Sequence, residues 1–436
     1  MPRLTITTQA RRFLCRLLFA SALLASGGSA FAQTTALVGA RLIDGAGKVV
    51  ESGTVIIEGN HILRSGAAQS TPIPTGATRI DLTGKTVMPG LVNAHGHVAA
   101  TRGMQSGPSF YTKDNLTRQL RTYAQYGVTS VFSLGDDEQA GFALRDAQGT
   151  GPLDRARIFV AGPVITGATA ADAVAATNRA ADMKPDLLKV RVDDNLGTDT
   201  KMPEPAWRAA ISQAHQRGLR IAVHVFYLDD AKAIVAAGGD FVAHSVRDRP
   251  VDAAFVSALK SRAVCYSPTL MREVSTFAYD ATPPWANDPF FLKGAEPGIA
   301  KILSDAARQA RFRASAGWKT GQKYKAGLEV AKRNLKTLAD QGVRIAFGTD
   351  SGPPGRFQGF FEQLELEMMV EAGLSPMQAL VAATGDAARC HGQGGQLGTL
   401  AAGGAADLLV LSANPLDNIR NMRAIEQVWI SGRRAF

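Results

Sequence analysis

Cysteine is scarce in this sequence, with three residues in 436. A scaffold held together by many disulfides, as in small secreted domains, is therefore excluded. Long apolar runs are scarce as well: only one stretch, near the N-terminus, could approach a bilayer, which excludes a helical membrane bundle. The proportions of hydrophobic residues (45%) and charged residues (20%) are ordinary for a globular protein and do not suit a disordered chain.

The formal net charge of +10 raises the question of a nucleic-acid partner. The sequence has no zinc-finger spacing and no run of Lys and Arg interleaved with aromatic residues. One cluster is basic, and a solvated helical face explains it at least as well as a phosphate-binding stripe: Arg311, Arg313, Lys319, Lys323 and Lys325. We therefore predict no nucleic-acid partner.

Residues 1–32 have the pattern of a secretory signal peptide. They contain four arginines and no acidic residue, followed by a short apolar run and the triplet Ala30-Phe31-Ala32. The run is too short to span a membrane. We expect cleavage after the triplet and export to the periplasm or the cell exterior, with no membrane attachment afterwards. The pair Arg11-Arg12 resembles a twin-arginine signal, although ordinary Sec export carries more weight.

Two cysteines, Cys265 and Cys390, remain after this cleavage. The two could pair in an oxidising compartment. However, Cys265 lies in an apolar, strand-like run, where a cysteine commonly behaves as a small hydrophobic residue. We therefore expect Cys265 to be a buried free thiol.

Short strand-like segments broken by turns occupy both ends of the mature chain. They lie within residues 35–88, with Gly or Asn at the breaks, and again at 407–411 and 425–430. Neither piece is long enough to build a good core alone. We expect residues 33–88 and 397–436 to form one small β-sandwich.

Between these ends, strand-like runs alternate with helical patterns. Eight runs are present: 91–95, 128–132, 157–160, 187–192, 221–225, 241–244, 263–266 and 344–348. This alternation indicates an α/β fold with a parallel sheet, and eight units predict a closed (β/α)8 TIM barrel over residues 89–396. A doubly wound open sheet is the competing architecture. The connection 270–343 is much longer than the others, which indicates either a lid or binding loop, or a self-packed excursion.

Histidines gather at the ends of the predicted barrel strands. His95 and His97 are two apart on an extended segment, so their side chains point to the same side. His224 and His244 close the fifth and sixth strands, and Asp350 follows the eighth. Taken singly, each histidine could belong to the core, and Asp350 could cap a helix. Together they converge on the face where barrel enzymes hold their active sites, which predicts a divalent metal site with zinc as its natural occupant.

Lys189 lies in the middle of an apolar strand-like run. A buried ammonium is costly without a partner, and burial lowers the pKa of an amine enough to make it a nucleophile. Such a lysine can add carbon dioxide to form a carbamate, an anionic ligand that can bridge two metals. The alternative is an ion pair with Asp193 or Asp194.

These motifs resemble the amidohydrolase superfamily of metal-dependent hydrolases, over nearly all of residues 35–436. The residues that carry the resemblance are Met88-Pro89-Gly90-Leu91-Val92-Asn93-Ala94-His95-Gly96-His97, Lys189, His224, His244, Phe347-Gly348-Thr349-Asp350, Leu397-Gly398-Thr399-Leu400 and Ala406-Asp407-Leu408-Leu409-Val410-Leu411. Within the superfamily, the chain is most similar to the imidazolonepropionase-related, prolidase-like branch. That branch includes dipeptidases, carboxypeptidases that cleave N-acyl amino acids, and hydrolases of aromatic amides such as ochratoxin.

The resemblance implies a role for each position. His95, His97 and Asp350 would hold a buried metal, and His224 and His244 a more exposed one. Carboxylated Lys189 would bridge the two metals together with a hydroxide. The hydroxide would attack the amide carbonyl, and Asp350 would take its proton and return it to the leaving amine. The resemblance also favours a homo-oligomer.

Some positions depart from the family pattern. Many relatives carry His or Tyr two residues after the strand-five histidine, where this chain has Phe226 followed by Tyr227. The Tyr227 hydroxyl is a candidate to bind substrate and the developing oxyanion. Arg191 is a candidate to bind a substrate carboxylate, with a structural ion pair as its alternative, and Arg356 is a further candidate. The bridging Lys189 argues against imidazolonepropionase activity, since that enzyme pattern lacks it.

The leading hypothesis is therefore an exported, binuclear zinc amidohydrolase acting on a small molecule, either a dipeptide, an N-acyl amino acid or an aromatic amide. A second hypothesis keeps the fold and changes the substrate to a lactone, a cyclic amide or an imidazolone. A third is a metal-free binding protein, which would not need a buried lysine among converging histidines.

Overall fold

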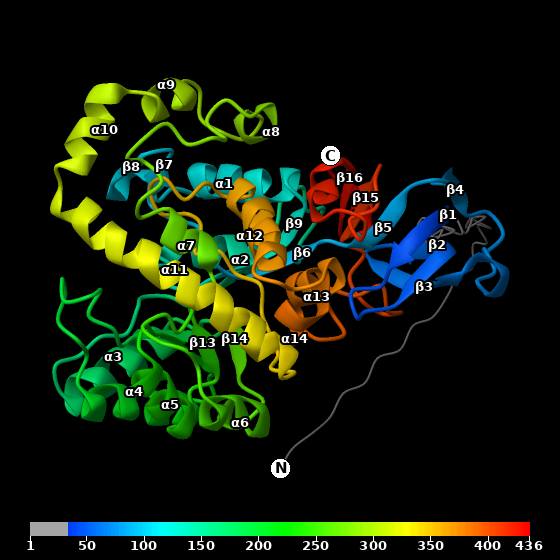
Figure 1. The fold of residues 1–436 in the computed structure, drawn as a ribbon. Coiled ribbons are helices and arrows are strands. Elements are labelled where there is room, and N and C mark those ends of the chain that lie inside the picture. The colour runs from blue at the N-terminus through cyan, green and yellow to red at the C-terminus, as the bar shows by residue number, and fades with distance from the viewer. Residues whose placement is uncertain (1–33) are drawn as a thin grey trace, which may run out of the picture. The chain divides into compact units, whose positions relative to one another are not determined.

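Both ends of the chain contribute to one mixed sheet in the computed structural model, which describes residues 34–436; the predicted signal peptide lies outside them. Figure 1 shows the blue and red strands of this sheet side by side. The strand order is β17-β16-β15-β5-β1-β2-β3, with β4 also paired to β1. The bounds are β1 Thr34–Ile43, β2 Val49–Glu58, β3 His61–Ala67, β4 Thr78–Asp81, β5 Thr86–Pro89, β15 Leu408–Leu411, β16 Ile425–Ile430 and β17 Arg433–Arg434.

The two chain ends meet along β5 and β15. These strands are antiparallel, with Met88 opposite Leu409, and both residues are fully buried. A close approach nearby requires glycine: Gly45 has a φ of +79°, and a Cβ there would lie 2.1 Å from the carbonyl oxygen of Gly398. The C-terminal segment therefore completes the sheet that the N-terminal segment begins.

Seven of the eight strands predicted between these ends form two parallel sheets. One has the order β10-β9-β6 and the other β11-β12-β13-β14. Their apolar runs are buried because helices cover parallel strands. The bounds are β6 Leu91–Gly96, β9 Val128–Ser133, β10 Arg157–Val160, β11 Leu188–Arg191, β12 Ile221–His224, β13 Phe241–Ala243 and β14 Cys265–Ser267.

The two parallel sheets approach each other through single bridges. Ile345, in the eighth predicted strand, forms an isolated parallel bridge with Tyr266 of β14, and Ala94 of β6 donates from its backbone to Phe347 O at 2.8 Å. Ile165 forms the corresponding bridge with Val190 of β11. The fold is thus α/β, and the eighth predicted strand is an extended segment with ladder-like hydrogen bonds on both sides.

Six helices of ordinary length alternate with these strands, as the sequence pattern predicted. In Figure 1, α3, α4, α5 and α6 lie in a row beside the green strands. Within residues 34–436, no helix is both long and apolar enough to cross a membrane. The bounds are α1 Lys113–Gln125, α2 Gln139–Ala147, α3 Ala170–Asp182, α4 Glu204–Gln216, α5 Leu228–Ala236 and α6 Ala253–Ser261.

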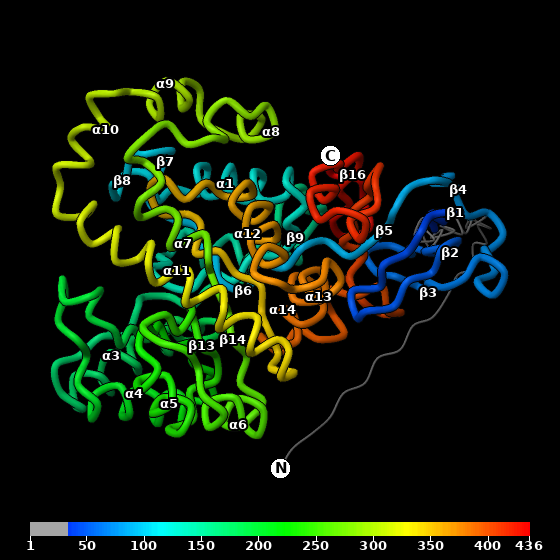
Figure 2. The backbone as a smooth tube through the Cα atoms, viewed as in Figure 1, coloured from blue at the N-terminus to red at the C-terminus, as the bar shows by residue number. Residues whose placement is uncertain are grey.

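The long connection after β14 is helical. Figure 2 shows it leaving the strands, passing through α8 to α10, and returning along α11. Its aromatic side chains pack mainly on one another and on α12: the ring centroids of Trp285 and Phe291 are 5.0 Å apart, and those of Phe291 and Phe360 are also 5.0 Å apart. The bounds are α7 Leu270–Val274, α8 Pro289–Leu292, α9 Ile299–Leu303, α10 Ala306–Arg313 and α11 Ala316–Asp340.

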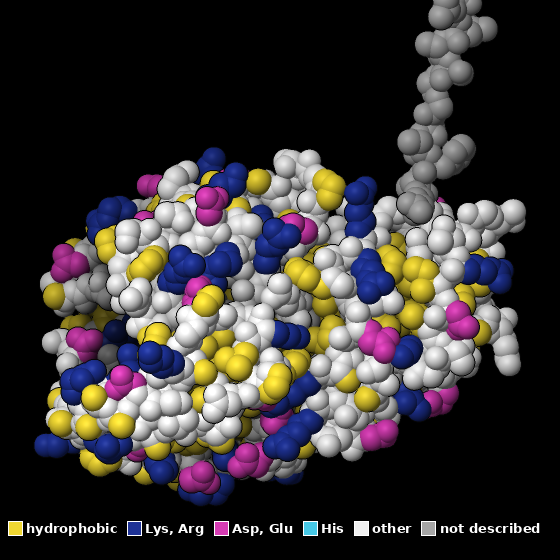
Figure 3. All heavy atoms as spheres, turned by 90° about the horizontal axis from the view of Figure 1, so that it is seen from above, with side chains coloured by type: hydrophobic (Ala, Val, Ile, Leu, Met, Phe, Trp, Pro, Cys, Tyr) yellow, Lys and Arg dark blue, Asp and Glu magenta, His cyan; other side chains and the backbone are white. Residues whose placement is uncertain are grey.

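The remaining elements complete the described chain. On the face in Figure 3, the Lys and Arg side chains are interspersed with Asp and Glu. The remaining bounds are η1 Ala68–Ser70, β7 Thr101–Arg102, β8 Gln105–Ser106, η2 Pro108–Phe110, α12 Phe360–Glu371, α13 Pro376–Val381, η3 Ala382–Asp386, α14 Ala387–Cys390 and η4 Ile419–Arg423.

The prediction of a free thiol at Cys265 is wrong. Cys265, at the start of β14, forms a disulfide with Cys390, at the end of α14, and the two Cα atoms are 5.9 Å apart. Both residues are buried. An apolar neighbourhood suits a buried thiol and half of a disulfide equally well, and the partner lies 125 positions away in the sequence. The sequence pattern around Cys265 therefore could not reveal the pairing.

His391, the next residue after the disulfide, supports the strand that carries His95. Its Nε2 contacts the carbonyl oxygen of Ala94 at 2.9 Å, and its ring stacks on Phe132 and Phe241. Burial lowers the pKa of His391 to about 3, so the ring is neutral at pH 7 and can donate one hydrogen bond to the carbonyl. The disulfide thereby fixes the position of a residue that lies against β6.

We predict that removing the disulfide lowers the stability of the fold. The double variant Cys265→Ala/Cys390→Ala should lose about 2–4 kcal/mol of unfolding free energy, since the bridge closes a long loop and constrains the unfolded chain. Urea unfolding of both proteins measures the difference. Adding a reductant should destabilise the wild type and leave the double variant unchanged; equal denaturation midpoints for the two proteins without reductant would refute the prediction.

Candidate functional site

One cavity of about 810 Å³ is lined by all six side chains that the sequence predicts as metal ligands. They come from the ends of four strands of the two parallel sheets, β6, β11, β12 and β13, and from the eighth extended segment. The set consists of His95, His97, Lys189, His224, His244 and Asp350. The cavity volume suits a small organic molecule.

Asp350 is at the centre of the closest group. Its Oδ1 lies 2.8 Å from His97 Nε2 and 3.5 Å from His95 Nε2, while Lys189 Nζ lies 3.3 Å from His95 Nε2. Potential ligand atoms of His95, His244 and Asp350 all lie within 4.8 Å of one another. Three buried side chains at this spacing can hold a metal ion. His224 joins them through its ring, whose centroid is 4.0 Å from that of His244.

Hydrogen bonds orient the imidazoles from behind. His97 Nδ1 faces the carbonyl oxygen of Gly135 at 3.2 Å, and His244 Nδ1 faces Thr269 Oγ1 at 2.7 Å, so Nε2 of each ring is directed to the site. His224 is oriented the other way, because its Nε2 contacts Asp193 Oδ2 at 2.8 Å and leaves Nδ1 free. Metal-binding histidines in proteins are held by outer partners of this kind.

Two of the predicted ligands have strained backbones. His244 has a φ of +76° and Asp350 a φ of +57°, and Thr269, which contacts His244, has a φ of +45°. Non-glycine residues in the left-handed region cost free energy, and such strain is concentrated at functional sites. The surrounding structure therefore holds these side chains in the cavity against a local backbone preference.

Burial favours the neutral forms of four nitrogen groups. It lowers the pKa of Lys189 to about 8, which raises the share of free amine, and that of His224 to about 4, and it lowers the pKa values of His95 and His244 well below the usual range. Burial alone would raise the pKa of Asp350, but the neighbouring Arg356 and His97 together hold it well below its ordinary value. Neutral imidazoles and an ionised carboxylate are the forms that bind metal.

Asp193, one of the two carboxylates considered as a partner of Lys189, is buried and contacts His224. Burial opposes ionisation of this carboxyl, but the neighbouring His224 holds the pKa of Asp193 below its usual range. Sequence analysis considered Asp193 only as a counter-charge. Its contact with His224 could not be read from spacing, because the two residues lie on adjacent strand ends.

Arg191, Tyr227 and Arg356 differ in their relation to the cavity. Arg191 lines the cavity but pairs with Asp199, and its Nε lies 3.8 Å from Asp193 Oδ1. Arg356 lines it and pairs with Asp350, while its Nε donates to Ser275 Oγ at 3.0 Å. Tyr227 is absent from the cavity wall.

The hydroxyl of Tyr227 is directed to a carboxylate. It donates to Asp194 Oδ1 at 2.9 Å, and the Lys201 ammonium lies 5.0 Å from the ring centroid. Its neighbour Phe226 packs under the guanidinium of Arg247. The structure therefore does not bring Tyr227 together with the other candidate residues.

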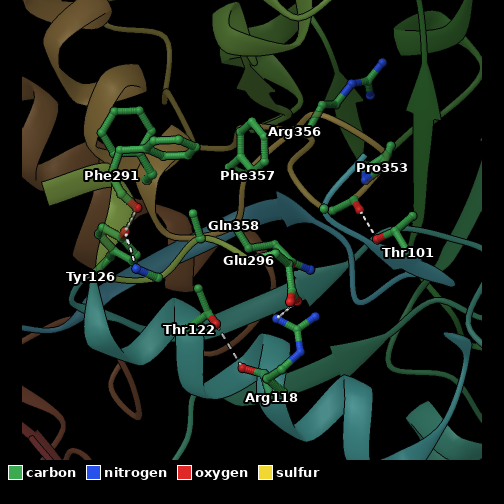
Figure 4. Close-up of a pocket in the computed structure, with 15 residues that line it drawn as sticks. Thr101, Arg118, Thr122, Tyr126, Phe291, Glu296, Pro353, Arg356, Phe357 and Gln358 are labelled. Atoms are coloured by element: carbon green, nitrogen blue, oxygen red, sulfur yellow. Dashed lines mark hydrogen bonds and ion pairs between the residues drawn. The ribbon is translucent and has the colours of Figure 1, made fainter. Parts of the chain in front are cut away.

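A second, smaller cavity adjoins the first at the loop that precedes α12. Figure 4 shows Arg118 facing Glu296 across it, at 2.9 Å, with Phe291 and Phe357 on another side. Arg356 lines both cavities, and in Figure 4 its guanidinium points away from the Arg118–Glu296 pair. The loop that carries Arg356 therefore separates this space from the metal-ligand cluster.

Glu362 of α12, which sequence analysis did not single out, lies behind the metal-ligand cluster. Its Oε1 accepts hydrogen bonds of 2.6 Å from Asn93, Thr349 and Ser351, and its Oε2 accepts one from the Gly359 backbone. Asn93 precedes His95 by two residues, and Thr349 and Ser351 flank Asp350. One buried carboxylate thus fixes both ligand-bearing segments.

Glu365, one helical turn later, anchors the start of α7. It accepts from the backbone nitrogens of Leu270 and Met271 at 2.8 and 2.7 Å. The signal in the sequence was two glutamates three apart among apolar residues of one helix, which brings them to the same face. That pattern indicates buried carboxylates only when a polar partner is known to face them.

The model of the amidohydrolase family matches residues 86–435. The chain belongs to the amidohydrolase family. The match identifies it as a hydrolase of a metal-dependent family, in agreement with a His/Asp cluster that can bind metal.

Solved structures share the fold at low sequence identity. A Xaa-Pro dipeptidase with bound methionine has a TM-score of 0.73 at 22% identity, covering 92% of this chain and 99% of its own. Ochratoxinase from A. niger has a TM-score of 0.72 at 18% identity, with coverage of 93% and 96%. Molinate hydrolase has a TM-score of 0.70 at 20% identity, with coverage of 93% and 95%.

One curated protein matches over a short segment. A 5-methylthioadenosine/S-adenosylhomocysteine deaminase from Symbiobacterium thermophilum is 44% identical over 57 residues, which is 13% of this chain and 13% of the deaminase.

We predict that Glu365 makes stability depend on pH. Burial raises the pKa of Glu365 to about 8, above the ordinary value of 4.5. Its contribution to unfolding free energy is fully present below pH 4.5 and is lost as pH rises to about 8, at up to roughly 1.4 kcal/mol per pH unit. Glu365→Gln should therefore lose less stability than the wild type between pH 5 and 8 in urea titrations.

The matched control is Glu371→Gln, which changes an exposed glutamate of the same helix. Its pH dependence should follow that of the wild type. An E365Q variant with the same slope as the wild type would contradict the assignment.

Proposed function

We propose that this protein is an exported, binuclear hydrolase of C–N bonds, with dipeptides, N-acyl amino acids or ochratoxin-like aromatic amides as substrates. The observation that carries the proposal is the buried amine of Lys189, 3.3 Å from His95 Nε2 and inside the histidine cluster. Burying an amine among imidazoles is costly unless a ligand set requires it there. Family membership and the dipeptidase and ochratoxinase folds support the reaction class.

The residues present fit a pair of divalent metal ions, with zinc as the natural occupant. Buried His95 Nδ1 has no hydrogen-bond partner, His224 and His244 each use only one ring nitrogen in a hydrogen bond, and His97 Nε2 faces Asp350 Oδ1. His95, His97 and Asp350 would hold the buried ion, and His224 and His244 the more exposed one. Metal ions bound there would polarise a substrate carbonyl and lower the pKa of water.

Lys189 and Asp350 would perform the remaining steps. The neutral Lys189 amine adds to carbon dioxide, forming an N–C bond and losing one proton, and the resulting carbamate offers two anionic oxygens as a bridging ligand. Ionised Asp350 takes a proton from the attacking water and returns it to the leaving nitrogen. The lowered pKa of Asp350 keeps its carboxylate ionised, which is the form that can accept this proton. Arg191 remains our candidate contact for substrate at the cavity rim.

The finer architecture follows from the same proposal. We interpret the two parallel sheets as a (β/α)8 barrel over residues 89–396, on the support of the bridges at Ile345 and Ile165. Residues 33–88 and 397–436 would form the β-sandwich, on the support of their shared sheet.

The Cys265–Cys390 disulfide supports export to an oxidising compartment after removal of residues 1–32. A homo-oligomer is part of the proposal.

A second candidate is a deaminase that uses a single metal, which the short match to the Symbiobacterium thermophilum enzyme favours. The two candidates differ in what they require of Lys189. A single-metal site has no use for a bridging carbamate, whereas the binuclear hydrolase depends on it.

We predict about two metal ions per chain in mature protein purified with bicarbonate and without chelator. Lys189→Ala should lose the exposed ion and at least 100-fold in kcat/KM on dipeptides and N-acyl amino acids, since the bridging ligand is gone. Elemental mass spectrometry and a substrate panel measure both effects. The control is Lys232→Ala, which removes an exposed lysine paired with Asp252.

One metal per chain with deaminase activity retained in K189A would favour the second candidate. Activity confined to lactones or cyclic amides would keep the fold and change the substrate class. A chain that binds no metal even after reconstitution would refute the hydrolase proposal.

A further inference from the structure

Two buried arginines share one glutamate beside the metal-ligand cavity. Arg247 Nε lies 3.0 Å from Glu273 Oε1, and Arg272 Nη1 lies 3.2 Å from Glu273 Oε2. Arg247 and Glu273 are 1% exposed and Arg272 is 6% exposed. The group therefore carries two positive charges and one negative charge away from bulk water.

Neighbouring groups leave part of this positive charge unpaired. Arg272 Nε and Arg247 Nη2 are buried without a hydrogen-bond acceptor. The carboxylates nearest the cluster are engaged elsewhere: Asp193 contacts His224, and Asp350 contacts His97 and Arg356. An uncompensated buried charge is costly, so such an arrangement persists where a ligand supplies the missing anion.

Only one of the two arginines reaches the cavity. Arg272 lines it, together with His244 and Asp350, whereas Arg247 donates to the backbone oxygens of Val225 and Ser245 behind it. Arg272 rests on the ring of Tyr324, 4.3 Å from its centroid. The exposed edge of the cluster is therefore the guanidinium of Arg272.

Backbone contacts fix the position of the Arg272 guanidinium relative to the predicted metal ligands. Thr269, three residues before Arg272, contacts His244 Nδ1, and Glu365 binds the backbone nitrogens of Leu270 and Met271. Each of the other two arginines in the cavity wall pairs with a carboxylate that no second arginine shares: Asp199 for Arg191, and Asp350 for Arg356. Arg272, by contrast, has only a share of Glu273, which also pairs with Arg247. Arg272 is thus the arginine best prepared to receive an external carboxylate.

We propose that Arg272 binds a carboxylate of the substrate, so that the preferred substrates are amides bearing a free carboxylate, such as N-acyl amino acids and dipeptides, and not neutral aromatic amides. The identity of the cleaved bond rests on the proposed function. Recognition of the anion does not, since it needs only the guanidinium and the cavity. Arg247 and Glu273 act behind Arg272 and position it.

The first experiment measures binding without chemistry. Calorimetry compares 3-phenylpropanoate with the neutral 3-phenylpropan-1-ol, neither of which has a C–N bond to cleave, on the protein as purified with its metals. The wild type should bind the carboxylate more tightly, and Arg272→Met should lose about 10- to 100-fold of that affinity with little change for the alcohol. Arg272→Lys, which keeps the charge and loses the planar fork, should recover part of it.

The matched control is Arg249→Met, which changes an exposed arginine paired with Asp229. Circular dichroism of each variant shows whether the fold is intact, and if R272M does not fold, the comparison of R272K with the wild type replaces it. No preference of the wild type for the carboxylate, or a preference that persists unchanged in every folded Arg272 variant, would overturn the proposal.

The second experiment uses hydrolysis of N-acetyl-L-phenylalanine and the neutral N-acetyl-L-phenylalaninol. In R272M, KM should rise about 10- to 100-fold for the acid and stay nearly constant for the alcohol, while kcat changes less. Hydrolysis of neither compound, together with an Arg272-dependent preference for 3-phenylpropanoate, would sink the proposed function and leave the anion site standing. Equal hydrolysis of both compounds by the wild type, with no preference for 3-phenylpropanoate over the alcohol, would support the proposed function and overturn the anion site.

Discussion

The proposed chemistry of this protein depends on the contact between the amine of Lys189 and the imidazole of His95. Both groups are buried, and burial shifts both towards their neutral forms: it lowers the pKa of Lys189 to about 8 and that of His95 well below its usual range. Neutral nitrogen is what a metal ligand or a carbon dioxide acceptor requires. The strained conformations of His244 and Asp350 bring further ligands to the same point. The strained backbone therefore costs conformational free energy, and it holds together polar side chains that an apolar core would exclude.

Helix α12 connects the two sides of the cavity. Glu362 binds the segments that carry His95 and Asp350, and Glu365 binds the start of α7, which carries Arg272. The distance between the metal ligands and the substrate-facing guanidinium is thus fixed by two carboxylates one turn apart on one rigid element.

Sequence patterns predicted much of this arrangement. Seven of eight parallel strands and the convergence of His95, Lys189 and Asp350 followed from alternation of apolar residues and from residues at strand ends. Pairings between distant segments did not follow, because no local pattern encodes them: the Asp193–His224 contact and the disulfide are of this kind. Arg272 was missed because it lies in the long insertion, where no strand end marked its orientation.

The link from Cys390 to His391 joins oxidation state to the shape of the active site. The disulfide tethers α14. The imidazole of His391, the next residue, contacts the carbonyl of Ala94, which directly precedes His95. Protein made in a reducing cytoplasm would lack this tether even where it folds. Preparations from the two compartments would then differ in how firmly His95, the first of the predicted metal ligands, is held. The cell compartment used for expression therefore becomes an experimental variable in any assay of this enzyme.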